Sequence, residues 1–180
     1  PRAWSAPPRP WPGSPFGLGK MTGGYAHRTV GHFLLDALDL LIGKRGFLGH
    51  NLALFLALPG AVWLLRRRVA ETPEIAWALV FFGGGWLIYA LTSNNYSGVC
   101  ASIRWYVPLL APGYYCLIVL LRHAPQYRND LAILTAFGLA LGLSMWWEGP
   151  WMQHMVPGFW FIQGAAALCW LAWRFSPRKS

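Results

Sequence analysis

The chain has 180 residues, of which 56% are hydrophobic and only 12% charged, and its mean hydropathy is +0.36. A soluble domain carries about 25% charged residues, so this composition excludes an ordinary soluble globular domain. The net charge of +9 does not indicate nucleic-acid binding, because the basic residues stand at the ends of apolar blocks and form no stripe with interleaved aromatics. Membrane orientation and anionic lipid headgroups account for them.

The first segment, residues 1–28, is rich in Pro and Gly and contains the run WPGSPFGLGKMTGG. Each Pro removes an amide donor and fixes its own φ, so a regular helix is not expected. We predict an extended, turn-rich extracytoplasmic loop. The chain starts at Pro1 without Met or a signal-peptide pattern, and we therefore expect it to be the C-terminal part of a longer protein.

Residues 29–46 predict an amphipathic helix that begins at Thr29 as N-cap. At about 14 residues, with two aspartates inside, it is too short and too polar to span, so we expect it to lie in the membrane interface. His32, Asp36 and Asp39 share the face opposite the apolar one, with a spacing that suits a divalent metal. Polar residues must occupy that face in any case, and we predict no metal site. The apolar face consists of Val30, Phe33, Leu34, Ala37, Leu38 and Leu41.

Five apolar blocks follow, and we predict an all-α membrane domain over residues 47–173, with a cytoplasmic tail at 174–180. Blocks of 17 to 19 residues reach roughly 25 to 29 Å, close to the hydrocarbon core of about 30 Å. Glycines inside the second and fourth blocks indicate close helix packing; they are Gly83, Gly84, Gly85, Gly138 and Gly142. The predicted transmembrane helices cover about residues 47–65, 75–91, 105–121, 131–147 and 157–173.

The basic residues predict the orientation of these five helices. The loops at residues 66–74 and 122–130 and the tail at 174–180 carry eight Lys or Arg, whereas the two intervening loops carry only Arg104. Positively charged loops stay in the cytoplasm. We therefore expect a multi-pass protein of the plasma (inner) membrane, with its N-terminal segment outside and its C-terminus inside.

The outer loop between the second and third blocks, TSNNYSGVCASIR, contains the strongest candidate site. Arg104 at the membrane edge can bind a phosphate group bidentately, and Asn94, Asn95 and Tyr96 offer hydrogen bonds to a sugar or peptide. The alternative is that Arg104 snorkels to ordinary headgroups while the Asn residues cap helix ends. The three cysteines have no CxxC spacing, so neither a disulfide framework nor a zinc site is indicated.

Three features together resemble bacterial membrane glycosyltransferases of the GT-C type, such as protein mannosyltransferases and aminoarabinose transferases. They are the Pro/Gly-rich outer stretch, the segment LLIGKRGFLGHNLALFLALPG, and the loop and span NNYSGVCASIRWYVPLLAP. The resemblance implies an inverting sugar transfer from a polyprenyl-phosphate carrier on the outer face, without cofactor. It places Arg104, with Tyr106 beside it, near the lipid-phosphate pocket. The family's base lies in the first outer loop, which would precede Pro1, so no catalytic residue can be assigned.

A second hypothesis is a non-enzymatic membrane subunit or lipid-binding scaffold that assembles with other membrane helices through its glycine faces. A transporter is disfavoured, because no charged residue lies in the middle of a predicted span to mark an ion path. The expected partners are membrane lipid, a polyprenyl-phosphate sugar and further membrane helices. Nucleic acid is not among them.

Overall fold

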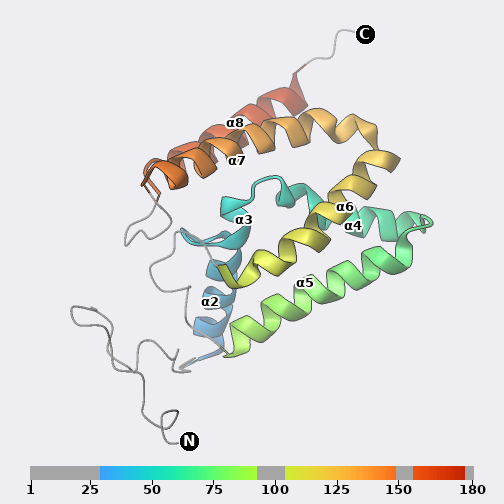
Figure 1. Cartoon of the computed structure of the whole chain (residues 1–180), viewed down its shortest axis with the longest axis horizontal. Helices are drawn as coiled ribbons and strands as arrows, with labels where there is room; N and C mark the ends of the chain where they lie inside the picture. The colour runs from blue at the N-terminus through green and yellow to red at the C-terminus, as the bar shows by residue number, and fades with distance from the viewer. Residues whose placement is uncertain (1–28, 93–103, 149–155, 177–180) are drawn as a thin grey trace, which may run out of the picture.

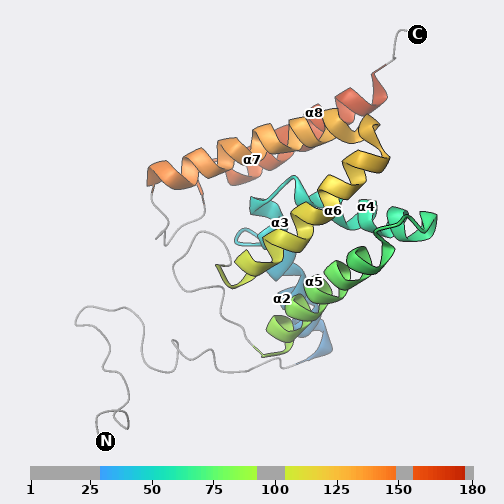
Figure 2. The same cartoon turned by 45° about the vertical axis from the view of Figure 1, so that its right-hand side comes forward.

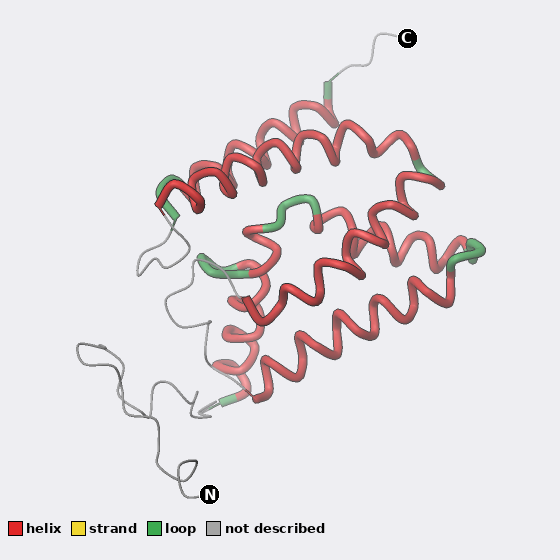
Figure 3. The backbone as a smooth tube through the Cα atoms, viewed as in Figure 1, coloured by secondary structure: helices red, strands yellow, loops and turns green. Residues whose placement is uncertain are grey.

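The computed structural model describes residues 29–92, 104–148 and 156–176, and within these ranges every regular element is a helix. This agrees with the predicted all-α fold. The predicted extracytoplasmic loop at residues 1–28 lies outside the described residues, as do Asn94, Asn95 and Tyr96. Figure 3 shows the helices and the short connections between them.

The first described helix, α2 (Val30–Ile42), begins where the sequence predicts. The Oγ1 atom of Thr29 accepts a hydrogen bond from the backbone N–H of His32 at 3.2 Å, which caps the helix. The predicted amphipathic pattern is only partly right, because Asp36 and Asp39 are half-buried rather than fully exposed. The residues of α2 that face the protein are Phe33, Ala37, Leu40 and Leu41; those that remain exposed are Val30, Leu34, Leu35, Leu38 and Ile42.

The predicted first span at residues 47–65 is not one continuous helix. It consists of a short helix, α3 (Phe47–His50), and α4 (Leu54–Arg67), and the chain bends by 99° between Val30–His50 and Leu54–Arg67. The side chain of Asn51 donates to the carbonyl of Phe47 at 2.7 Å, while its backbone N–H turns to the carbonyl of Leu48. A polar side chain thus takes the carbonyl that a continuing α-helix would use, and the helix ends there.

Two helices of the described residues are long and apolar enough to cross a membrane, or three if the bent pair forms one span. They are α5 (Thr72–Thr92) and α7 (Arg128–Glu148), the latter extended by the 3₁₀ turn η2 (Pro125–Tyr127). The other three predicted spans are shorter as α-helices. At 14 residues each, α4 and α6 (Leu110–His123) reach about 21 Å, and α8 (Phe159–Phe175) at 17 residues reaches about 26 Å. A 3₁₀ helix, η1 (Arg104–Leu109), leads directly into α6.

The helices from α4 to α8 alternate in direction along the chain (Figures 1 and 2). The ends of α4, α6 and α8 and the starts of α5 and α7 lie toward the right in both views. Among the described residues, these helix ends carry the arginines Arg66, Arg67, Arg122, Arg128 and Arg174. The basic segments of the sequence are therefore gathered at one end of the helical bundle, here called the basic end.

Two glycines allow α4 and α6 to pack closely against each other. A Cβ atom added at Gly60 would lie 2.5 Å from Cδ2 of Leu120, and one added at Gly113 would lie 2.9 Å from Cδ2 of Leu54. Small residues thus permit close helix approach, as expected in a membrane. The glycines singled out from the sequence behave differently, because only Gly85 lies against a neighbour, Leu109. Nothing lies within 4 Å of a Cβ built at Gly83, Gly84, Gly138 or Gly142, so the interpretation of these four as packing contacts is wrong within the described residues.

Large apolar side chains cover much of the outer surface. Trp77, Ile118, Leu139 and Leu168 are each at least 61% exposed, and they come from four different helices. Such a surface would be costly in water and is compatible with a lipid environment.

Candidate functional site

The candidate site predicted around Arg104 lies at the corner where η1 leads into α6. Arg104 is the first residue of η1, and Tyr106 follows two residues later. The Tyr106 side chain is only 1% exposed. Its ring meets Phe47 edge-on at 5.6 Å between centroids and Tyr89 edge-on at 5.3 Å. Its hydroxyl donates a long hydrogen bond of 3.5 Å to the carbonyl of Trp86. Tyr106 therefore anchors η1 from within the protein instead of lying on the surface beside a ligand.

An aromatic cluster surrounds this anchor and was not anticipated from the sequence. Phe47 contacts Phe82 at 6.0 Å between ring centroids, and the indole N–H of Trp86 donates to the carbonyl of Ala37 in α2 at 2.8 Å. Each well-placed aromatic pair contributes about 0.5–1.5 kcal/mol beyond its buried area. The cluster fixes α2, α3, α5 and η1 relative to one another. The sequence feature that indicates this cluster is the spacing of Phe82, Trp86 and Tyr89, which puts them on one face of a helix.

His50 lies at the break between α3 and α4 and is buried. Its Nδ1 atom is 2.9 Å from the carbonyl oxygen of Gly46, and its ring lies 4.9 Å from that of Phe159. Nε2 has no hydrogen-bond partner in the described part of the chain. Gln163 of α8 donates to the carbonyl of Gly49, so α8 closes over the break. Neither ring nitrogen of His50 is hydrogen-bonded to a carboxylate of the described residues.

Glu71 connects two helices at the basic end. It lies immediately before α5 and pairs with Arg122 at 3.1 Å and with His123 at 2.9 Å, both in the last turn of α6. The hydrogen bond from His123 is the main reason why the pKa of Glu71 lies below its usual value. Glu71 thus joins the start of α5 to the end of α6.

A second polar cluster joins α7 to α8. Asp130, in the first turn of α7, is fully buried, and its Oδ1 atom accepts hydrogen bonds of 2.8 Å from both Arg174 Nε and Trp170 Nε1. The Arg174 guanidinium also lies over the ring of Tyr127, 4.9 Å from its centroid. In the sequence these two residues fall in the predicted loop at 122–130 and the predicted tail at 174–180, and no local pattern indicates that they pair.

The described residues hold no group of three or more His, Cys, Asp or Glu suited to a metal, so His32, Asp36 and Asp39 are not gathered as ligands. Cys116 is buried and Cys169 exposed, and both are free thiols.

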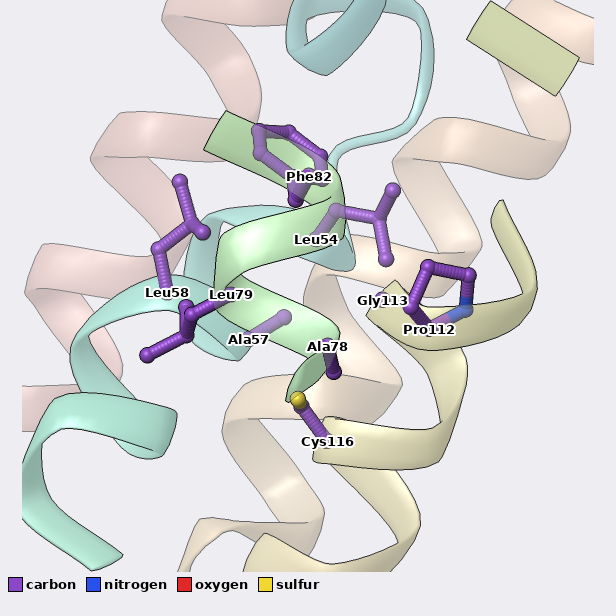
Figure 4. Close-up of a pocket in the computed structure, with 9 residues that line it drawn as sticks. All are labelled: Leu54, Ala57, Leu58, Ala78, Leu79, Phe82, Pro112, Gly113 and Cys116. Carbon is purple, nitrogen blue, oxygen red and sulfur yellow. The ribbon is translucent and has the colours of Figure 1, made fainter. Parts of the chain in front are cut away.

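A cavity of about 10 Å³ lies between α4, α5 and α6 (Figure 4). That volume is at the limit for one water molecule, and an apolar cavity of this size stays dry. Its lining consists of Leu54, Ala57, Leu58, Ala78, Leu79, Phe82, Pro112, Gly113 and Cys116.

Fold and composition together define the class of this chain as a helical, membrane-associated protein. No family model, curated protein or solved structure matches it.

Proposed function

We propose that α4 to α8 cross the bacterial inner membrane as five helices, with the basic end in the cytoplasm and the corner at Arg104 outside. The alternation of the helices and the gathering of arginines at one end support this topology. The short α6 gains length from η1, and the short α4 and α8 are accommodated by local thinning of the bilayer.

Cysteine labelling tests this topology. Gln126 and Glu148 are both exposed and lie at opposite ends of η2 and α7. In a background free of native cysteines, an impermeant maleimide applied to intact cells is expected to label Glu148→Cys and to spare Gln126→Cys until the cells are permeabilised. Labelling of Gln126→Cys in intact cells would refute the orientation.

We further propose that the chain is the C-terminal membrane part of a GT-C type glycosyltransferase that uses a polyprenyl-phosphate-linked sugar donor at the outer face. The observation that carries this proposal is the anchoring of η1. The buried Tyr106 holds the backbone two residues from Arg104, at the end of the bundle opposite the basic end. A guanidinium held at headgroup depth can bind the donor phosphate and stabilise it as a leaving group.

Substitution of Arg104 in the complete protein tests the proposal. Arg104→Ala is expected to weaken donor binding by about 10- to 150-fold, because a charged hydrogen bond to phosphate contributes about 1.5 to 3 kcal/mol. Arg104→Lys should restore only part of the affinity, since an ammonium lacks the planar fork. Arg66→Ala is the matched control, because Arg66 is an exposed arginine at the opposite end. Donor binding by Arg104→Ala within about twofold of the Arg66→Ala protein would contradict the proposal.

Tyr106 gives a separate test of positioning. Tyr106→Phe keeps the ring contacts and removes only the long hydrogen bond, so donor affinity should stay within about twofold of the parent. Tyr106→Ala removes the anchor and should weaken donor binding. If Tyr106→Phe weakened donor binding as much as Arg104→Ala, the hydroxyl would have to contact the ligand directly, and the anchoring role would be wrong.

The second candidate function is a non-enzymatic membrane subunit or lipid-binding scaffold. It is favoured by the open space beside Gly138 and Gly142 on α7, which leaves room for a foreign helix or lipid. Under this hypothesis Gly142→Leu should impair assembly of the complete protein in the membrane, measured by native gel mobility, whereas Arg104→Ala should leave assembly unchanged.

A further inference from the structure

A groove between α6 and α7 opens on the surface near the basic end, with a volume of about 430 Å³. It contains one charged residue, Arg128, at the very start of α7, and its remaining lining is almost entirely apolar. In both views α6 and α7 meet at their right-hand ends and then diverge (Figures 1 and 2). The groove is lined by one face of α7 and by Leu121 of α6. The lining consists of Leu121, Arg128, Leu131, Ala132, Thr135, Ala136 and Leu139.

The α7 side of the groove follows one face of the helix. The positions from Arg128 to Leu139 recur at steps of three and four residues and extend about 16 Å along the helix axis. Gly142 continues the same face, and nothing lies within 4 Å of a Cβ built there. Small side chains at Ala132 and Ala136 keep the groove open. The groove is therefore long and apolar, with the cationic side chain of Arg128 at one end.

The arginines near this groove differ in their partners. Arg122 pairs with Glu71 and Arg174 with Asp130. Arg128 is exposed, and no carboxylate of the described residues lies within ion-pair distance of it. Its five N–H donors are thus available for an anion at the mouth of the groove.

We propose that this groove binds one anionic phospholipid of the cytoplasmic leaflet, with an acyl chain along α7 and the headgroup phosphate on Arg128. The placement in that leaflet rests on the proposed topology, but not on glycosyltransferase activity. Charge complementarity favours an anionic lipid, rather than a second copy of the chain, as the occupant of the groove. Each copy carries a net charge of +9 with its arginines gathered at the same end, so a parallel copy would bring like charge to Arg128, whereas the headgroup brings opposite charge.

The experiment uses the full chain in phosphatidylcholine vesicles with a trace of acyl-spin-labelled phosphatidylglycerol or phosphatidylcholine. Electron paramagnetic resonance measures the fraction of labelled lipid that the protein immobilises. The parent chain is expected to immobilise phosphatidylglycerol in preference to phosphatidylcholine. Arg128→Ala should lower the relative affinity for phosphatidylglycerol about fivefold, which corresponds to about 1 kcal/mol for one basic residue at a membrane surface. Arg66→Ala, the matched exposed arginine at the same end, should lower it clearly less, because Arg66 does not line the groove.

A second variant keeps the charge and fills the groove. Thr135 is exposed and lines the groove, so Thr135→Trp should lower the immobilised fraction of phosphatidylglycerol although Arg128 is intact. Equal effects of Arg128→Ala and Arg66→Ala, or no effect of Thr135→Trp, would overturn the proposal. So would efficient disulfide cross-linking of Leu139→Cys between copies in native membranes, because a second chain would then cover the groove. Vesicles offer both leaflets, so a reversed topology would change the cysteine labelling but not this measurement.

Discussion

The buried pair between Asp130 and Arg174 gives the sharpest test of how α7 and α8 are held together. Asp130 is fully buried, and Arg174 and Trp170 donate hydrogen bonds to it, both to Oδ1. Its Oδ2 atom has no partner among the described residues. Replacement of Arg174 by Leu would leave a buried carboxylate with a single neutral hydrogen bond. Removal of one partner of a buried ion pair lowers the free energy of unfolding more than replacement of both partners by apolar residues.

Loss of one partner of a buried pair costs about 3–5 kcal/mol. The Arg174 side chain is 29% exposed, so water screens part of the interaction and we expect about 3 kcal/mol, near the lower limit. That is a change of about 150-fold in the unfolding equilibrium. Asp130→Asn keeps the shape of the side chain, and the Arg174 guanidinium can still reach water. This substitution should therefore lower the free energy of unfolding by less, about 1 kcal/mol.

The assay is reversible unfolding of the purified chain in mixed micelles, followed by circular dichroism. The double variant Asp130→Asn with Arg174→Leu should be more stable than the sum of the single effects predicts, with a coupling energy of about 2 kcal/mol. Arg66→Leu serves as the control for removal of an exposed arginine and should change stability by less than about 0.5 kcal/mol. If Arg174→Leu changed stability no more than Arg66→Leu, or if the two single effects were simply additive, the reasoning about this pair would be wrong.

Three further predictions concern packing, hydrogen bonding and pH. Gly60→Ala should destabilise the chain by about 1–2 kcal/mol in the same unfolding assay, because its Cβ would meet the buried Leu120. The control Gly83→Ala meets nothing and should be neutral or stabilising by up to about 1 kcal/mol; equal effects would contradict the close approach of α4 and α6. Trp170→Phe should cost about 1–2 kcal/mol through loss of its hydrogen bond to Asp130, and an unchanged unfolding curve would argue against that bond. The pKa of Glu71 is lowered in the folded chain, so its contribution to stability is present above the unfolded pKa and is lost as pH falls through the folded value. In His123→Phe the pKa of Glu71 should move back toward its ordinary value, so less stability should be lost on acidification than in the parent; superimposable pH profiles would refute the role of His123.

Local signals in the sequence predicted several elements well. Thr29 followed by apolar residues at helical spacing indicated α2, and the structure has the cap at that residue. The long apolar blocks that became α5 and α7 were recognisable from length and hydropathy, because a continuous apolar run has few alternatives in a membrane.

The bend between α3 and α4 was not predicted. Pro59 lies inside α4 and does not end it. The preceding helix, α3, ends at Asn51, whose side chain competes for a backbone carbonyl. The polar pair of His50 and Asn51 inside an apolar block was the available signal, but a hydropathy average conceals it.

The candidate site was predictable only in part. The position of Arg104 at the start of a helical segment followed from the loop pattern, whereas the burial of Tyr106 depends on Phe47 and Tyr89, which lie on two other elements. The pair of Asp130 and Arg174 and the groove beside Arg128 likewise arise from segments that are distant in sequence. Contacts of this kind can be recognised only when the three-dimensional arrangement of the helices is known.

The two polar clusters lie at the same end of the bundle, with Glu71 pinning α5 to α6 and Asp130 pinning α7 to α8. An ion pair at one end fixes the lengthwise register of two helices, because a slide of one turn, about 5.4 Å, would separate the charges. Apolar contacts of Leu134 and Leu141 hold the remainder of α7 against its neighbours. The polar clusters therefore set the register of the helices, and the apolar core keeps them together.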